Sequence, residues 1–386
     1  MKDRVHPADP PPRSPGDIIV IALFSLLLLA PATIALTGHA GFDTAFIEST
    51  ELRRPFTAPP PTKGALATGG WQRDAEREIA DAFPLRRHLI EAYDSAKYAW
   101  LRDVGSTHVI RGRDGWLFYG DEERSYITGD QRPSDADLTR LAAIYRARAE
   151  AAARHGARYI VLIVPNKSTV YENELPPGMR IVTPTPADRL SLRLRALGVP
   201  LIEMRFALTA AAAKGEVYSK GDTHWNDAGA YLGYQAIITA LRDTGVPVGL
   251  RGAAIRSHVE TGDGDLLRLA GIASLARNDV VRYDFERHAH AVAAPSYPTA
   301  PETSALVAEA FENPSSRGPG AVIFGDSFAD ALAPFVAESF RRTVLLRHVN
   351  VTDVQFAERV VAAEKPAVVI QEIVERNLIY AANFKP

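Results

Sequence analysis

The sequence predicts an α/β protein built on a mainly parallel β-sheet. Mostly apolar runs with the length of strands recur from residue 159 onward, as in "YIVLIVP" (159–165) and "AVVIQEIV" (367–374). Such runs are typical of strands that are buried on both faces. Segments with helical periodicity separate them, and strands that alternate with helices form parallel sheets with right-handed crossovers. A serine in a tight turn follows one of these strands, where open α/β sheets collect their active sites.

The expected elements of this region follow one another in a regular order. Helices are predicted at residues 135–155, 186–198, 226–245, 328–340 and 354–364, and a further helix ends at Lys214. Strands are predicted at residues 159–165, 199–203, 320–324, 343–347 and 367–374. Gly156 suits the C-terminal cap of the first helix, and Asn226 or Asp227 suits the N-cap of the third. Residues 251–318 contain Pro and Gly without clear periodicity and are predicted to be irregular.

The preceding part of the chain has a different character. "VIRGRDGWLFY" (109–119) predicts two short strands around the Asp114-Gly115 turn. Apolar residues at helical spacing predict helices between Trp71 and Asp103, with a break at Pro84. We expect five parts along the chain: a cytoplasmic leader (1–17), a transmembrane anchor or signal (18–36), a linker (37–70), a helical lead-in (71–105) and one large domain (106–386).

An uncharged run of 19 residues, 18–36, predicts insertion into a membrane. At 1.5 Å per residue it just spans a hydrocarbon core of about 30 Å. A retained anchor is favoured over a signal peptide cleaved near residues 38–40, because the run is long and the cleavage pattern is poor. Lys2, Arg4 and Arg13 favour a cytoplasmic N-terminus. The chain is therefore expected to be a single-pass protein of the inner membrane with its large domain in the periplasm.

Composition excludes several classes of function. The 386 residues carry a formal net charge of −2, so no basic excess indicates a nucleic-acid partner. The chain has no cysteine, which excludes disulfides, a cysteine nucleophile and thiolate metal sites. His288 and His290 lack a third ligand nearby in the sequence, so no metal is expected.

The stretch "VIFGDSFAD" (322–330) places Ser327 in a turn between a buried strand and a helix. A serine hydroxyl there lies beside the unpaired N–H groups of the first helical turn, which can stabilise an oxyanion during acyl transfer. Gly325 lets the backbone turn sharply and leaves room for a substrate. Taken alone, the stretch fits equally well an ordinary β–α connection in which Asp326 or Ser327 caps the helix.

The stretch "YSKGDTHWND" (218–227) contains a candidate base for the serine and a carboxylate that could orient that base. In extended chain, residues i and i+2 point the same way, so the side chains of Asp222 and His224 can lie together. The carboxylate would orient the imidazole, and the free ring nitrogen would activate a serine hydroxyl. Alone, the pair also fits a surface aspartate and a buried structural histidine. Together the two stretches predict a Ser-His-Asp triad of Asp222, His224 and Ser327.

The motifs and their order resemble the SGNH-hydrolase-like domain of the alginate O-acetyltransferase family of AlgJ and AlgX. The resemblance rests on "GDTHWN" (221–226), "GDSF" (325–328), "GRDGWLFY" (112–119), "IVPNKSTVYENELP" (163–176), "TGDGDLLRLA" (261–270) and "AVVIQEIVERNL" (367–378). The serine follows the Asp/His pair, the reverse of ordinary SGNH hydrolases, as in a circular permutation. The apolar segment makes the chain more similar to membrane-anchored AlgJ than to secreted AlgX, and we see no C-terminal carbohydrate-binding domain like that of AlgX.

The resemblance implies a three-layer α/β/α fold and O-acetylation of an exported polysaccharide, alginate or another. Ser327 would carry the acetyl group, His224 would act as base and acid, and Asp222 would orient the ring. The acetyl group would come from a membrane-bound O-acyltransferase that uses acetyl-CoA, and the chain itself would need no cofactor. A carbohydrate acetylesterase with the same triad is the first alternative. A non-catalytic glycan-binding or assembly protein is the second.

Further residues are candidates for substrate binding. Lys167 follows a strand at the expected active-site edge and could bind a sugar carboxylate or hydroxyl, or could simply be solvated. Trp116 and Tyr119 could stack on a sugar ring or lie in the core. Trp225 could wall the site or pack beneath it. Arg376 could reach the substrate or form a structural ion pair with Glu372. The glycine-rich "TGDGDL" (261–266) lacks the lysine of a phosphate loop and could give backbone donors to the site.

Overall fold

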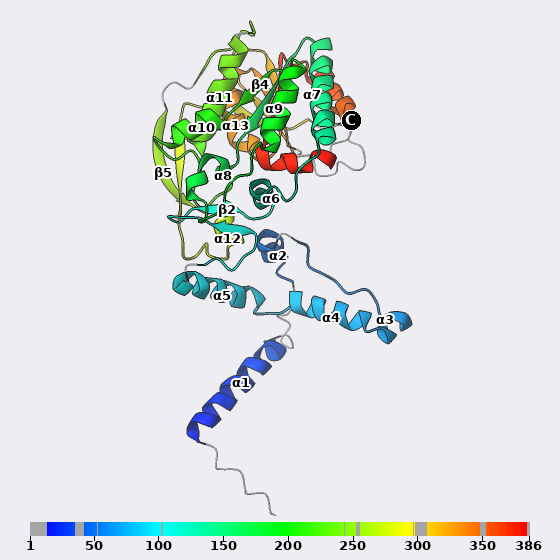
Figure 1. The fold of residues 1–386 in the computed structure, drawn as a ribbon, viewed down its shortest axis with the longest axis vertical. Helices are drawn as coiled ribbons and strands as arrows, with labels where there is room; N and C mark the ends of the chain where they lie inside the picture. The colour runs from blue at the N-terminus through cyan, green and yellow to red at the C-terminus, as the bar shows by residue number, and fades with distance from the viewer. Residues whose placement is uncertain are drawn as a thin grey trace, which may run out of the picture. The chain divides into compact units, whose positions relative to one another are not determined.

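The computed structural model describes residues 14–34, 42–51, 53–101, 103–242, 244–251, 255–295, 297, 307–347 and 353–383. The chain divides into two compact units, Met1–Leu101 and Arg102–Pro386, as Figure 1 shows. All the residues predicted to be catalytic belong to the second unit. The predicted lead-in, residues 71–105, and domain, residues 106–386, remain predictions.

The described part of the first unit is helical. Its elements are α1 (Pro15–Ile34), α2 (Thr44–Thr50), α3 (Lys63–Ala67), α4 (Gly70–Asp81) and α5 (Arg86–Leu101). The interruption between α4 and α5 includes Pro84, as predicted. Two short helices, α2 and α3, lie within the stretch predicted as a linker. Asp81 ties this stretch to α4, because its carboxylate accepts two hydrogen bonds from the Arg53 guanidinium, at 2.6 and 2.7 Å.

Helix α1 contains most of the apolar run, but the predicted transmembrane anchor is wrong. Among the described residues, no helix has both the length and the apolarity that a membrane crossing requires. The uncharged part of α1 runs from Ile18 to Ile34. At 1.5 Å per residue these residues span only about 25 Å, short of a hydrocarbon core of about 30 Å. The predicted location as a single-pass protein of the inner membrane is therefore corrected as well.

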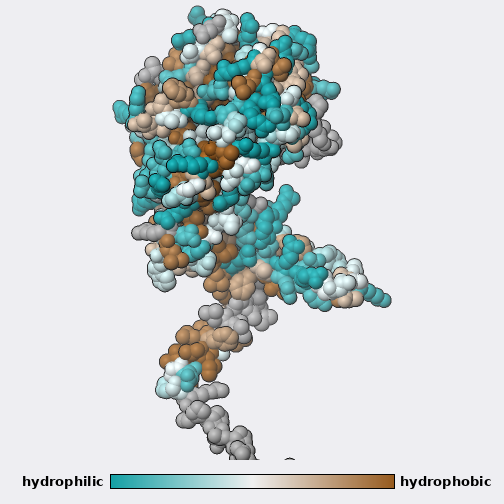
Figure 2. Space-filling view, viewed as in Figure 1, coloured by the Kyte–Doolittle hydropathy of each residue, from teal (hydrophilic) through white to brown (hydrophobic). Residues whose placement is uncertain are grey.

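The described apolar side chains between Ile18 and Leu29 of α1 are nonetheless mostly exposed. Figure 2 shows them as a brown stretch, in contrast to the largely hydrophilic visible face of the second unit. The structure does not describe residues 35 and 36, the end of the predicted anchor. The alternative signal-peptide cleavage site at residues 38–40 also lies outside the described residues.

The second unit is built on a seven-stranded sheet. The strand order is β4-β3-β11-β9-β10-β8-β7. The strands are β3 (Arg158–Val164), β4 (Leu201–Glu203), β7 (His290–Val292), β8 (Val307–Glu312), β9 (Gly320–Gly325), β10 (Arg342–Arg347) and β11 (Val368–Val374). The five strands from β4 to β10 are parallel, but β8 pairs antiparallel with both β10 and β7. The sheet is therefore mixed, with an antiparallel edge that the sequence did not predict.

Successive side chains of a strand face opposite sides of the sheet, so apolar residues on both faces need to be covered. Two layers of helices cover these two faces. Ile160, Leu162 and Val164 of β3 belong to one core, which α10 (Arg205–Ala212), α11 (Asp227–Arg242) and α13 (Ala329–Ser339) complete. Val161 and Ile163 belong to the other core, which α7 (Asp135–Arg154), α9 (Pro186–Ala196) and α14 (Val354–Glu364) complete. The predicted three-layer α/β/α arrangement is present.

Residues 251–318 were predicted to be irregular but contain further elements. They hold β7 and β8, the antiparallel pair β5 (Arg256–Gly262) and β6 (Asn278–Asp284), and the short helix α12 (Asp265–Leu269). Their strands are rich in charged residues, and β5 is largely exposed. Such strands lack the continuous apolar run that reveals a strand buried on both faces.

The remaining elements connect the layers. The predicted hairpin is present as β1 (Val109–Arg111) and β2 (Leu117–Tyr119). It is followed by α6 (Glu122–Thr128), and later in the chain come α8 (Lys167–Val170), η2 (Glu172–Glu174) and the final 3-10 segment η4 (Glu375–Asn383). The main-chain N–H of Leu117 donates to the carbonyl of Lys220 at 3.0 Å, so the hairpin lies against the loop that carries Asp222.

We expect replacement of Ile323 by alanine to destabilise the protein by about 2–5 kcal/mol. Ile323 lies in the middle of β9 and is fully buried, so the change leaves a cavity under the serine turn. Leu192→Ala is the control, since Leu192 on α9 is 69% exposed and its loss should change stability by less than about 0.5 kcal/mol. Urea unfolding of the full chain followed by tryptophan fluorescence measures both. Equal effects of the two substitutions would contradict the assignment of β9 to the core.

Candidate active site

Ser327 lies in the turn between β9 and α13, and the carboxylate of Asp326 fixes this turn. One carboxylate oxygen accepts from the N–H of Phe328 at 3.0 Å. The other accepts from the N–H of Val374 at 2.9 Å and from the side-chain amide of Asn377 at 2.7 Å. Asp326 therefore caps the serine turn and also ties it to the end of the neighbouring strand β11.

Gly325 is required at the end of β9 because its surroundings leave no room for a side chain. A Cβ atom there would lie 2.7 Å from the Cβ of Ala329 and 2.8 Å from a carboxylate oxygen of Glu372. The same Glu372 oxygen accepts a hydrogen bond from the N–H of Asp326 at 3.0 Å. The close approach of these groups sets the path of the chain into Ser327.

Asp222, His224 and Ser327 form one row of hydrogen-bonded side chains. The Nδ1 atom of His224 lies 2.9 Å from Oδ1 of Asp222, and the same oxygen accepts from the His224 main-chain N–H at 2.9 Å. The Nε2 atom of His224 lies 2.8 Å from the Oγ atom of Ser327. With the Nδ1 proton directed at the carboxylate, Nε2 is free to accept from the serine hydroxyl. The structure thus brings the three residues together, and their catalytic roles stay a prediction.

The carboxyl group of Asp222 remains ionised in this row. Burial alone would raise its pKa, but the hydrogen bonds and the charge of His224 outweigh burial and lower the pKa to about 2. An ionised carboxylate can hold the imidazole in one tautomer and can stabilise the imidazolium that forms when the ring takes a proton.

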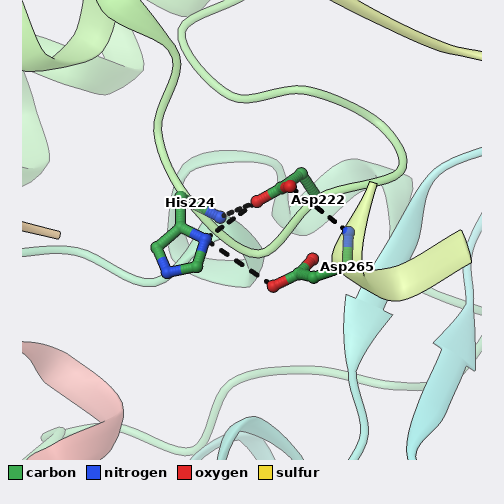
Figure 3. Close-up of side chains that lie close together, drawn as sticks. All are labelled: Asp222, His224 and Asp265. Carbon is green, nitrogen blue, oxygen red and sulfur yellow. Dashed lines mark hydrogen bonds and ion pairs between the residues drawn. The ribbon is translucent and has the colours of Figure 1, made fainter. Parts of the chain in front are cut away.

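Asp265 is a second carboxylate beside the histidine, and sequence reasoning did not single it out. Figure 3 shows it opposite Asp222, with Oδ2 3.6 Å from Nδ1 of His224. Its carboxylate also accepts from the N–H of Thr223 at 2.7 Å and from the Thr223 hydroxyl. Its own N–H donates to Asp222 at 3.3 Å. The glycine-rich stretch 261–266 thus supplies one backbone donor to the site, as predicted, and a carboxylate besides.

Within the part of the chain that the structure describes, the same three side chains form a group that could hold a metal ion. One ligand atom each from Asp222, His224 and Asp265 lies within 4.8 Å of the others. A metal ion on Nδ1 would replace the proton that the imidazole shares with Asp222, so metal binding and the hydrogen-bonded row exclude each other.

Ser327 and His224 open into a pocket of about 280 Å³. The remaining lining residues are Ser219, Asp222, Trp225, Asp263, Val280, Arg282, Asp330, Ala331 and Arg347. Arg347 pairs with Asp330 at 2.5 Å, and Arg282 lies 3.3 Å from Asp227. Burial raises the pKa of Asp330. The pocket therefore places polar and charged groups of both signs around the serine hydroxyl.

Two of the predicted substrate-binding residues are buried. Lys167 is fully buried, and its ammonium group donates to three main-chain carbonyls. Trp116 is only 5% exposed and packs against Tyr171, with ring centroids 4.0 Å apart. The lysine lies beneath the loop that carries Asp222, and the tryptophan belongs to the core; a substrate-binding role for either stays a prediction.

Tyr119, Arg376 and Trp225 also pack within the second unit. The Arg376 guanidinium is buried and lies 5.6 Å from the ring centroid of Tyr119 and 5.1 Å from that of Phe328. Its ion-pair partner is Glu123, at 3.9 Å, rather than the predicted Glu372.

Trp225 both lines the pocket and packs beneath it. Its indole N–H donates to the carbonyl of Phe328 at 3.0 Å. A substrate-binding role for Trp225, and one for the half-buried Tyr119, stays a prediction.

Comparison with known proteins identifies relatives of this chain. The chain is 26% identical over 227 residues to a probable alginate O-acetylase AlgJ of Pseudomonas syringae pv. tomato. The matched residues are 58% of this chain and 52% of the relative. The corresponding protein of Pseudomonas aeruginosa is 25% identical over 228 residues, again 58% and 52% of the two chains. The chain thus matches about half the length of these curated relatives.

Solved structures share the fold. The O-acetyltransferase domain of Pseudomonas putida AlgJ superposes with a TM-score of 0.50 at 20% identity, covering 70% of this chain and 92% of that domain. The structure of Bacillus cereus PatB1 with a sulfonyl adduct gives a TM-score of 0.53 at 17% identity, covering 70% and 97%.

A sequence model of one family covers most of the second unit. The family is described as the SGNH hydrolase-like domain of the acetyltransferase AlgX, and it matches residues 109–373. This range begins with β1 and ends in β11, and it includes Asp222, His224 and Ser327. The predicted family is confirmed: the chain belongs to the SGNH hydrolase-like acetyltransferase family of AlgX.

Proposed function

We propose that this protein transfers acetyl groups to hydroxyls of a polysaccharide through an acyl-enzyme on Ser327. The observation that carries the proposal is the 2.8 Å separation between Nε2 of His224 and Oγ of Ser327, with Asp222 on the far side of the ring. A serine hydroxyl becomes an effective nucleophile when a base can take its proton at this distance.

The reaction would proceed in two halves. Oγ of Ser327 attacks the acetyl carbonyl of the donor while Nε2 of His224 takes the hydroxyl proton, and the leaving group departs with that proton. A sugar hydroxyl then attacks the acetyl ester on Ser327, gives its proton to Nε2, and the ester bond to the enzyme breaks. The proton returns to Oγ, so the enzyme is regenerated unchanged.

The tetrahedral intermediate of each half carries an oxyanion that needs hydrogen-bond donors. Among the described residues, the main-chain N–H of Ser327 has no acceptor, whereas its neighbour Phe328 donates to Asp326. A free N–H at the start of a helix is suited to an oxyanion, since it is already oriented before the charge develops. We propose it as one oxyanion donor.

The acceptor and the donor are inferred from the relatives. Proteins named probable alginate O-acetylase suggest a polysaccharide acceptor, alginate or another exopolysaccharide. By family resemblance the acetyl group would be delivered by a membrane-bound O-acyltransferase.

The same row of side chains could also hydrolyse acetyl esters. The side chain of His224 is 32% exposed, so water can reach the acyl-enzyme as well as a sugar can. Transfer and hydrolysis then differ only in which hydroxyl attacks the ester on Ser327.

We expect an incubation with an acetyl ester donor and oligosaccharides to yield acetylated oligosaccharide detectable by mass spectrometry. The sugar hydroxyl should compete with water because it is held beside the acyl-enzyme by the pocket. Omission of the oligosaccharide is the control. Release of acetate at the same rate with and without oligosaccharide, with no acetylated sugar, would identify an esterase instead.

Ser327→Ala should lower the rate of acetyl transfer by about 10³-fold or more, because no acyl-enzyme can form. Ser315→Ala is the matched control, since Ser315 is exposed and lies outside the pocket. Mass spectrometry should detect acetyl-serine in the unsubstituted protein and should not detect it in Ser327→Ala. Full transfer activity of Ser327→Ala would refute the catalytic role and leave a glycan-binding or assembly protein.

Asp222→Asn should lower kcat by about 10²- to 10⁴-fold, because a neutral amide no longer selects the Nδ1-protonated imidazole. Asp263→Asn is the control: Asp263 is an exposed carboxylate on the rim of the same pocket, and its loss should change kcat by less than about tenfold. Steady-state kinetics at one pH compares the two. If both substitutions had the same small effect, Asp222 would not be the orienting carboxylate.

A further inference from the structure

Lys167 occupies an unusual position below the loop that carries Asp222 and His224. It follows the carboxyl end of β3 as the first residue of α8, and its side chain is fully buried. Its Nζ atom donates to the carbonyl oxygens of Ser219, Lys220 and Asp222 at 3.1, 3.1 and 2.6 Å. Three main-chain carbonyls of this one loop are therefore held by a single charged group.

The geometry matches an ammonium group in particular. An ammonium has three donors and no acceptor, and here each donor has a carbonyl oxygen. The rings of Trp116 and Phe118 lie alongside, with centroids 5.8 and 5.5 Å from Nζ. A buried charge is tolerated only when it is paired in this way, so removal of the ammonium would leave three carbonyls without a donor.

The charges around the ammonium come from four separate elements. Burial lowers the pKa of Lys167 to about 8, although the nearby carboxylates of Glu123 on α6, Asp265 on α12 and Asp222 oppose this effect. Arg376 on η4 lowers the pKa further. The lysine therefore carries its charge below about pH 8 and loses it above.

We propose that Lys167 is a positioning residue that holds the loop of Ser219 to His224 so that Asp222 and His224 meet Ser327. Without the ammonium, the Asp222 carbonyl loses the hydrogen bond of 2.6 Å from Lys167, and the imidazole shifts relative to the hydroxyl. The inference rests on the proposed function, because it assigns the effect of Lys167 to the acid–base pair of that reaction.

The first test compares Lys167→Met with Lys220→Met in the full chain, using release of 4-nitrophenol from 4-nitrophenyl acetate. Both ammonium groups lie beside the Trp116 ring, at 5.8 and 5.6 Å, but the Lys220 ammonium donates outward to the carbonyl of Asp114. Lys167→Met should lower kcat by about 10- to 100-fold with KM changed less than about twofold. Lys220→Met should change neither by more than about twofold. A folded Lys167→Met protein with unchanged kcat overturns the proposal.

The second test uses the pH profile and does not require the methionine variant to fold. In the unmodified chain, kcat should fall as the pH rises through about 8, because the ammonium loses its proton. Lys167→Arg keeps a charge that persists beyond about pH 12 and should remove this fall. Identical alkaline limbs in the two proteins overturn the proposal.

A failure of the proposed function can be told apart from a failure of this inference. If Ser327→Ala retains full activity, the reaction does not use the site at all. If Ser327→Ala is inactive while Lys167→Met and the pH profiles are unaffected, the site stands and only the role of Lys167 is wrong.

Discussion

The contact between His224 and Ser327 is the interaction on which the rest of the site depends. The two residues are 103 positions apart in sequence, and their side chains meet at 2.8 Å. The serine is fixed by the sheet, because it follows β9 directly. The histidine is on a loop, so its position depends on what holds that loop: the Lys167 ammonium from below and the Asp265 carboxylate from the side. The side chain of Asp222 then only has to orient the ring.

The same edge of the sheet uses buried carboxylates to fix main-chain amides. Asp326 accepts from the N–H of Val374, Glu372 accepts from the N–H of Asp326, and Glu375 accepts from the N–H of Asn166. These bonds join the ends of β3, β9 and β11, which are neighbours in the sheet. The pKa of Glu372 is raised well above its usual range, by burial first and by the charge of Asp326 second. The serine turn is thus anchored to the adjacent strand β11, which is itself joined to the end of β3, and does not rely on its own helix alone.

Much of the fold and of the candidate site could be predicted from the sequence. The parts that could not be predicted have physical reasons. The central strands are continuous apolar runs because both of their faces are buried, so they were visible. The strands within residues 251–318 form the antiparallel end of the sheet or the separate β5–β6 pair, and none of them is a long apolar run. Lys167 was expected at the active-site edge. The sequence alone does not distinguish a lysine whose side chain points to solvent from one whose side chain binds buried carbonyls. Asp265 became a neighbour of His224 only through the fold.

The order of the motifs along the chain matters less than the contacts between their neighbours. Trp225 follows the histidine and Phe328 follows the serine, and these two residues share their own hydrogen bond, from the indole N–H to the carbonyl, at 3.0 Å. The Phe328 ring also lies against the imidazole of His224, with centroids 5.1 Å apart. Trp225 and Phe328 are both buried, so their contact aligns the two segments in addition to the hydrogen bond between His224 and Ser327. Because this pair of aromatic neighbours joins the two segments in space, the order of His224 and Ser327 along the chain does not decide whether their side chains can meet.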